Sequence, residues 1–434
     1  MKNSRCILIG ASCVFILIAA WVITISTESA AEKQHSLILQ ATELINDGIY
    51  IRAVPLLEQA AELSAVHLKA AEEHLKVVYL ALIDSRGFSR KYTSLLKRQL
   101  SRKDVSSEIF AEAANYYLSV SRTGEALEIL KSGIEKTGCV HLCGMYENHR
   151  YAFGTIRTTF EYISEIKDGF VQVSRDGRWG IARANGTMLI PCEYEKISTF
   201  ESGRAIVMKG SEIFAVDRDN NRIALLHEAG ADMGNLMQNR IPLLIDGSWR
   251  RATGDFVLGD MQFEELGNYS EGYAAAKTGG RWGVIDIGSH WIVPPEYDEI
   301  KTDALGRSYG QGAVFALNGY GVYLIVDGQQ VGEPFEDARP FSSEGYAAVK
   351  KNGKWGFIDI NANVMIDFQF DDALSFGQHL AAVKIDEHWG YVSKAGRVEI
   401  NPQFLEARSF SGGNAPVLSH RGWQIISLLE YEYK

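Results

Sequence analysis

The hydrophobic pattern of the chain begins with twenty consecutive uncharged residues at positions 6–25 (CILIGASCVFILIAAWVITI). A helix of this length rises about 30 Å, which matches the hydrocarbon core of a bilayer. Because Lys2 and Arg5 precede the run, the positive-inside rule places the N-terminus in the cytoplasm and the remainder outside. The pattern predicts a single-pass transmembrane helix, with residues 1–33 as anchor and flank. The alternative is a signal peptide that is cleaved near Ala31 and leaves a secreted protein.

Apolar residues then recur at helical spacing through residues 34–138, a segment rich in Ala, Leu, Glu and Lys whose one proline is Pro55. Spacings of three and four predict amphipathic helices, and Gly48 and Gly124 stand where turns are expected. The runs after these glycines resemble the second helix of tetratricopeptide (TPR) repeats. We therefore expect an α-helical, TPR-like layer that serves as a stalk or offers a peptide-binding groove.

Residues 139–156 are predicted to be a linker between the helices and the next region. Cys139 and Cys143 lie in this segment with His141 between them. Because a zinc site needs three or four ligands and the chain has no second such pair, the two thiols are expected either to form a short-loop disulfide or to stay free.

Beyond this linker one pattern repeats: a short apolar run, a polar turn, a Trp-Gly pair and a second apolar run. The twelfth position after each Trp ends a predicted strand, and the fifteenth is aromatic. The pairs are Trp179-Gly180, Trp282-Gly283, Trp355-Gly356 and Trp389-Gly390; the twelfth positions are Pro191, Pro294, Asp367 and Asn401; the fifteenth positions are Tyr194, Tyr297, Phe370 and Phe404. Agreement at both offsets in four copies indicates that the tryptophan has one recurrent structural role.

Degenerate copies fill the gaps between these four. If Phe214, Trp249, Tyr320 and Trp423 stand in for the tryptophan, the successive spacings from Trp179 are 35, 35, 33, 38, 35, 34 and 34 residues. The pattern therefore predicts an array of eight units over residues 157–434.

The turns of a unit indicate how it folds. Asp176-Gly177 and Asn352-Gly353 are typical of two-residue hairpin turns, so each unit is interpreted as a meander of three strands. Such a meander is too small to bury its own face, and neighbours must stack to close the core. Eight units can close into a propeller-like ring, which we favour because closure removes exposed edges. An open β-solenoid is the alternative, since propeller blades usually have four strands.

The four clear units resemble the WG-repeat family, which carries a G-[KR]-W-G-x-[IV]-D core and a downstream P-x-x-Y/F. The resemblance implies a noncatalytic repeat module, common in bacterial envelope and secreted proteins, and it implies no particular ligand. The tryptophan is expected to pack in the core, with the glycine leaving room beside it; a sugar-stacking platform is the alternative. The structural residues assigned in this way are Trp179, Gly180, Trp282, Gly283, Trp355, Gly356, Trp389, Gly390, Trp249 and Trp423.

Composition and charge narrow the classes of function. The 434 residues are 46% hydrophobic and 23% charged, as in an ordinary folded protein. The net charge is 44 − 54 = −10, which speaks against a nucleic-acid partner because phosphate contacts need a basic face.

The sequence offers no clear catalytic or metal-binding motif. It contains no nucleophile elbow, no H-E-x-x-H and no P-loop. Residues 217–228 imitate the ligand spacing of a calcium loop, but Arg222 stands where that loop needs glycine, so a polar turn is predicted. Acidic residues such as Glu195 and Asp298 recur once per unit, whereas a catalytic pair would normally be unique. We expect no catalytic residue, no cofactor and no metal.

These patterns predict an α + all-β multidomain protein with a transmembrane helix, a TPR-like spacer and a β-repeat array. The expected function is that of a membrane-anchored, extracytoplasmic binding or scaffold protein that presents the array to a protein or a cell-envelope polysaccharide. The alternatives are a cell-wall-active hydrolase and a purely structural envelope protein.

Overall fold

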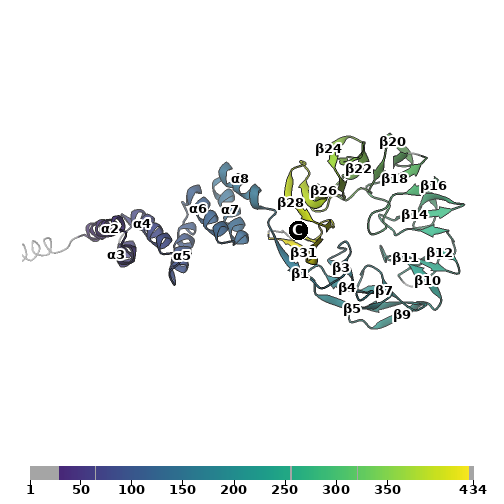
Figure 1. The fold of residues 1–434 in the computed structure, drawn as a ribbon, viewed down its shortest axis with the longest axis horizontal. Helices are drawn as coiled ribbons and strands as arrows, with labels where there is room; N and C mark the ends of the chain where they lie inside the picture. Colours follow the sequence, from purple (N-terminus) through teal and green to yellow (C-terminus); the bar gives the residue numbers. More distant parts are fainter. Residues whose placement is uncertain (1–28, 64, 255–256, 320, 430–434) are drawn as a thin grey trace, which may run out of the picture. The chain divides into compact units, whose positions relative to one another are not determined.

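The computed structural model describes residues 29–63, 65–254, 257–319 and 321–429 (Figure 1). These residues fall into two compact units, one up to Tyr146 and one from Glu147 onward. The first is helical, and the second consists almost entirely of β-sheet.

Seven helices precede the sheets among the described residues, as the helical periodicity predicts. Ser29 caps the first of them: its hydroxyl accepts a hydrogen bond from the Glu32 N–H, and the Glu32 carboxylate accepts one from the Ser29 N–H. Buried side chains such as Leu57, Leu96 and Leu130 form one continuous core. The helices are α2 (Ala30–Asn46), α3 (Tyr50–Leu63), α4 (Leu68–Ala81), α5 (Phe88–Leu100), α6 (Ser107–Ser119), α7 (Thr123–Thr137) and α8 (Val140–His149).

The two expected turns have different outcomes. Gly48 lies between α2 and α3 with a φ of +73°, a left-handed conformation that glycine adopts without cost. Gly124, which is expected near a turn, lies in the first turn of α7. The chain turns instead at Ser121, whose φ is +59°.

The predicted membrane anchor finds no support. Residues 6–25, which carry that prediction, lie outside the described residues. None of the helices that the structure describes is long and apolar enough to cross a membrane. We therefore correct the fold class to a helical region followed by a β-propeller, and we withdraw the predicted transmembrane helix and single-pass membrane location.

Eight antiparallel sheets form the blades of a β-propeller (Figure 1). Blades 1 to 8 begin at the innermost strands β2 (Tyr162–Ile163), β6 (Lys196–Ile197), β10 (Gly230–Met233), β13 (Glu265–Leu266), β17 (Glu299–Ile300), β21 (Asp337–Ala338), β25 (Asp372–Ala373) and β29 (Glu406–Ala407). The second strands are β3 (Phe170–Arg175), β7 (Arg204–Lys209), β11 (Arg240–Ile245), β14 (Tyr273–Thr278), β18 (Ala313–Asn318), β22 (Ala347–Lys351), β26 (Leu380–Ile385) and β30 (Asn414–Ser419).

The third strands carry the tryptophan positions, and the fourth strands form the outer rim. The third strands are β4 (Arg178–Arg183), β8 (Glu212–Asp217), β12 (Ser248–Thr253), β15 (Arg281–Asp286), β19 (Gly321–Val326), β23 (Lys354–Ile358), β27 (His388–Ser393) and β31 (Gly422–Leu428). The outer strands are β5 (Met188–Tyr194), β9 (Arg222–His227), β16 (Trp291–Tyr297), β20 (Gln329–Phe335), β24 (Val364–Phe370), β28 (Val398–Phe404) and, in blade 8, β1 (Phe153–Arg157). Blade 3 has three strands among the described residues, and residues 257–263 join it only through isolated bridges.

The prediction of three strands per unit is wrong for most blades. It misses the innermost strand, which is two residues long in seven blades and too short to give an alternating pattern. Each of these short strands forms a ladder with the second strand of its blade, as Tyr162 and Ile163 do with Ser174 and Val173.

The ring is closed, so the open solenoid is not the arrangement adopted. Strand β1 pairs antiparallel with β31, and blade 8 thus joins the two ends of the propeller sequence. A separate hydrophobic cluster lies between each pair of adjacent blades. The cluster between blades 8 and 1 contains Trp423 and Ile425 from one side and Phe160 and Ile163 from the other.

The Trp-Gly pair has a geometric reason in the four clear units. In blade 6 Trp355 pairs with Phe370 and Phe357 pairs with Ile366, so the outer strand bulges opposite Gly356. A Cβ atom on Gly356 would lie 2.7 Å from the Ile366 carbonyl oxygen, which only glycine avoids. The glycines at 180, 283 and 390 face the same carbonyl position of their own outer strands. The aromatic residue at offset fifteen is therefore the direct cross-strand partner of the tryptophan.

Two of the degenerate units are misaligned in the sequence interpretation. In blade 2 the register places Ile213, not Phe214, at the tryptophan position, because Ile213 pairs with Met208 and His227. In blade 5 the corresponding residue is Val322, which pairs with Phe335; Tyr320, the residue predicted there, lies outside the described residues.

Candidate functional site

The tryptophans of the repeat differ in exposure around the ring. Trp355, Trp389 and Trp423 are buried, with 5%, 9% and 5% of their surface exposed. Trp179, Trp249 and Trp282 are only half-buried. A uniform packing role would predict equal burial, so the blades are not equivalent.

An arginine covers the tryptophan in two of the blades with a buried ring. The Arg339 guanidinium lies 4.4 Å from the centre of the Trp355 ring, and that of Arg408 lies 4.7 Å from the Trp423 ring. Both arginines directly follow the innermost strand of their blade. Blade 1 has Ser164 at this position, and Trp179 has Tyr162 as its ring neighbour at 5.5 Å between centroids.

The residue after the innermost strand divides the ring into two halves. In every blade its backbone N–H donates to a carbonyl of the second strand, which fixes the equivalence. It is small in blades 1–4 and large in blades 5–8. The eight residues are Ser164, Ser198, Gly234, Gly267, Lys301, Arg339, Leu374 and Arg408.

A cavity of about 420 Å³, called the channel cavity from here on, lies on the side of the small residues. The small side chains at Ser164 and Gly234 leave space that lysine and arginine fill elsewhere, so the cavity follows from the sequence asymmetry. Its walls carry two aromatic rings and three amide side chains. They include Tyr162, Trp179, Gln172, Asn235, Asn268 and Lys196.

Hydrogen bonds between blades hold these amides in place. The Asn235 Oδ1 atom accepts from Gln172 Nε2 at 2.9 Å and from the Thr199 N–H at 3.1 Å. The Asn235 N–H donates to Asn268 Oδ1 at 2.8 Å, and Asn268 Nδ2 donates to the Leu305 carbonyl at 2.7 Å. The hydrogen bonds of the wall thus link blades 1 to 5, and such a network orients its amides.

An insertion in blade 5 supplies one side of the cavity. Twelve residues separate Ile300 from Ala313, whereas six separate Ile163 from Phe170 in blade 1. Asp303 folds the extra segment on itself by accepting from the N–H groups of Leu305 and Arg307, at 2.9 Å each. Residues 304–306 of this loop line the cavity.

A carboxylate with a shifted pKa lies next to this wall. Burial raises the pKa of Glu165 to about 7, and the nearby Asp303 carboxylate acts in the same direction. Arg408, Arg307 and the Ser409 N–H, which donates to Glu165 Oε2 at 3.0 Å, hold the pKa down. Glu165 therefore changes charge near neutral pH at the junction of blades 8 and 1.

The recurrent acidic residues have structural partners. Asp298 forms an ion pair with Arg281 of blade 4 and accepts a hydrogen bond from the Gly319 N–H of blade 5 at 2.9 Å. Asp371 bonds in the same way to Lys354 of blade 6 and to the Asp386 N–H of blade 7. Each carboxylate therefore joins two adjacent blades.

The segment at residues 217–228, whose spacing imitates a calcium loop, contains a hydrogen-bonded turn. Asp217 accepts from the N–H groups of Asp219 and Asn221, at 2.9 and 2.8 Å, and closes the turn that follows β8. Within the described part of the chain, no group of three or more His, Cys, Asp or Glu side chains could hold a metal ion.

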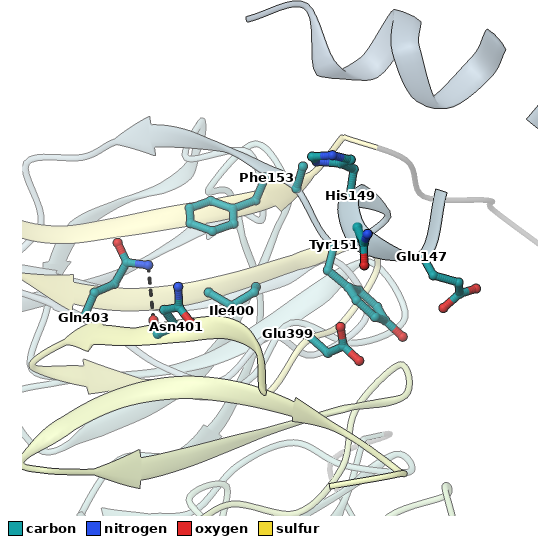
Figure 2. A pocket seen from close by; sticks show the side chains of 10 residues that line it. Glu147, His149, Tyr151, Phe153, Glu399, Ile400, Asn401 and Gln403 are labelled. Atoms are coloured by element: carbon teal, nitrogen blue, oxygen red, sulfur yellow. Dashed lines mark hydrogen bonds between the residues drawn. The ribbon is translucent and has the colours of Figure 1, made fainter. Parts of the chain in front are cut away.

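A second pocket of about 250 Å³ lies where β1 and the end of α8 meet β28 (Figure 2). His149, Tyr151 and Phe153 line it from one side, and Glu399 and Asn401 line it from the other. Glu399 is already paired with the Arg397 guanidinium at 2.8 Å. The second carboxylate of the pocket, Glu147, pairs with Arg150 at 3.1 Å. This pocket is smaller and more polar than the channel cavity, and both of its carboxylates are paired within the protein.

The sequence interpretation did not single out the cavity residues Gln172, Asn235 and Asn268. Two signals for the cavity are present in the sequence. The spacing between Trp282 and the next unit is the longest in the series, which reflects the insertion. The change from small to large residues after the innermost strand is visible only once that strand is recognised.

Comparisons with known proteins support the repeat that the sequence predicts. The model of the family described as WG containing repeat matches residues 179–212, 260–282, 282–303, 335–355, 355–387 and 389–420, which confirms the resemblance predicted from the Trp-Gly pairs. A comparison with curated protein sequences found no match.

Several solved structures are similar to the propeller region at low identity. They include a structure of the eukaryotic initiation factor (11% identity, TM-score 0.39, covering 65% of this chain and 88% of that one), the WD40 domain of SCAP from fission yeast (9%, 0.38, 65% and 99%) and the Neurospora crassa Pan2 WD40 domain (12%, 0.32, 66% and 92%). Similarity at this level does not indicate a function for this chain.

Proposed function

Because the C-terminal region of this chain is built of WG containing repeats, we propose that the protein is a noncatalytic binding and scaffold module. Its ligand, a protein or a glycan, enters the channel cavity, whose lining comes from blades 1–5. The observation that carries the proposal is the asymmetry of the residue after the innermost strand. Packing eight blades does not by itself require small residues in one half and large ones in the other, and two of the small residues, Ser164 and Gly234, line the cavity.

The hydrogen bonds and ion pairs of the recurrent acidic residues support a noncatalytic role. A general acid or base must reach a substrate proton, but Asp298 and Asp371 already bond to the turns and cations of two blades. In this proposal the helical region acts as a spacer that carries the propeller.

Filling the cavity tests the proposal. In Ser164→Arg, blade 1 receives the residue that blades 6 and 8 carry, and the new guanidinium is expected to stack on Trp179 and close the cavity. Ligands captured by the full-length wild-type chain should be lost, while the melting temperature should stay within a few degrees of wild type.

Leu374→Arg is the matched control, because it places arginine at the equivalent position of blade 7, away from the cavity. The two variants are compared by affinity capture followed by mass spectrometry. If Ser164→Arg and Leu374→Arg retain the same ligands as wild type, the channel cavity is not the binding site.

A further inference from the structure

We infer that the channel cavity binds a neutral, hydroxyl-rich saccharide unit. This inference rests on the proposed function and names the chemical class of its ligand. It depends on three properties of the wall: paired charges, amide groups with spare hydrogen-bonding capacity, and a half-buried tryptophan ring that no arginine covers.

The charged residues of the wall are neutralised within the protein. Lys196 forms an ion pair with Asp232, and Glu195 pairs with the Arg178 guanidinium at 3.2 Å. Both pairs are partly exposed and individually weak, but they leave no charged side chain of the wall without a counterion for a charged ligand to bind. The site therefore favours a ligand without net charge.

The remaining polar groups suit hydroxyls, which both donate and accept. The two protons on Gln172 Nε2 are used by the Ile197 carbonyl and by Asn235 Oδ1, so Gln172 Oε1 is left as an acceptor. Asn268 Nδ2 donates one proton to the Leu305 carbonyl and keeps the other. The Tyr162 hydroxyl and the Trp179 indole N–H have no hydrogen-bond partner among the described residues. Each is the polar group of an aromatic side chain and can bond to a ligand hydroxyl.

The aromatic part of the wall offers a stacking surface. Trp179 is half-buried, and Ser164 stands where arginine covers the corresponding ring in blades 6 and 8. The C–H groups of a pyranose ring carry partial positive charge and pack against the negative face of an aromatic ring. A mixed set of fixed neutral donors and acceptors then orients its hydroxyls.

A panel of neutral trisaccharides built from glucose, mannose, galactose or N-acetylglucosamine tests the inference on the full-length chain. Trimers of galacturonic acid and of glucosamine serve as the charged counterparts. Binding is followed by isothermal titration calorimetry and by tryptophan fluorescence. We expect saturable binding of at least one neutral trisaccharide, weakened at least tenfold by Trp179→Ala and by Ser164→Arg.

Trp282→Ala is the matched control, because Trp282 is also half-buried but does not line the cavity; its affinity should equal that of wild type. Binding of the charged trimers alone would overturn the inference, as would an equal loss in Trp282→Ala. If no saccharide binds while Ser164→Arg abolishes capture of a protein, the saccharide inference fails and the proposed function stands. If Ser164→Arg changes neither saccharide binding nor capture, both fail.

Discussion

The side chain that follows the innermost strand differs from blade to blade and changes what lies beside the tryptophan. Ser164 and Gly234 leave the wall open, whereas Arg339 reaches across to Trp355 and also pairs with Asp372 at 2.7 Å. In blades 6 and 8 an arginine at this position covers the tryptophan, whereas in blade 1 Ser164 leaves Trp179 on the wall of the cavity.

At the residue scale, the protonation of Glu165 should make the stability of the fold depend on pH. Its pKa is raised to about 7 in the folded state and is near 4.5 in an unfolded chain. Between these values the folded state holds a proton that the unfolded state releases, so stability should fall as pH rises from about 4.5 to about 7 and then level off. Asp303, Arg307 and Arg408 are the charged groups that face it.

Urea unfolding of wild type and Glu165→Gln at pH 5, 6, 7 and 8 measures this effect. The variant keeps a carbonyl to accept from the Ser409 N–H but does not titrate, so its stability should depend less on pH in this range. Parallel pH profiles for the two proteins would contradict the assignment.

At the scale of an element, the third and fourth strands of a blade are locked together by the tryptophan, its cross-strand aromatic partner and the glycine opposite the bulge. Trp355 contacts a core that includes Phe370 of its own blade and Ala381 of the next. The packing of one strand pair therefore extends to the neighbouring blade.

Trp355→Ala tests the structural assignment of the buried tryptophans. Removing a large buried side chain should cost about 3–5 kcal/mol, and the loss should extend to blade 7, because the core is shared. Trp282→Ala, at a half-buried ring, should cost clearly less. Denaturant unfolding of the full-length chain compares the two; equal stability of Trp355→Ala and wild type would refute the packing role.

The sequence was sufficient for the repeat and its aromatic pairs because Trp179 and Tyr194 are conspicuous residues at a fixed offset. It was insufficient for the units at Ile213 and Val322, where an ordinary aliphatic residue takes the tryptophan position and a nearby aromatic misleads the alignment. It also missed the innermost strands, since two residues give no periodicity. Asn235 and Asn268 lie two residues beyond the innermost strands of blades 3 and 4, so their position in the repeat could not be assigned while those strands were unrecognised.

At the scale of the whole molecule, the ring depends on one strand from the other end of the propeller sequence. β1 covers the edge of β31 through five residue pairs. Without it, the backbone groups of that edge would be unpaired and open to another chain.

Two fragments test this closure. One begins at Glu147 and keeps β1; the other begins at Thr158 and lacks it. The shorter fragment should melt at a lower temperature and self-associate in size-exclusion chromatography, because its edge is open. If both fragments are monomeric with the same melting temperature, closure by β1 does not stabilise the ring.

The pairing of β1 with β31 also has a consequence for the order of synthesis. Phe153 meets Leu428, so the first strand to leave the ribosome must wait for a partner 428 − 153 = 275 residues later. At about 5–20 residues per second, that wait is about 14–55 s. Helices α2 to α7 belong to the first unit and can fold early, whereas blade 8 cannot exist until translation is nearly complete. During translation the nascent propeller is therefore an open chain of blades with two unpaired ends, and this is the period in which it is most exposed to misassembly.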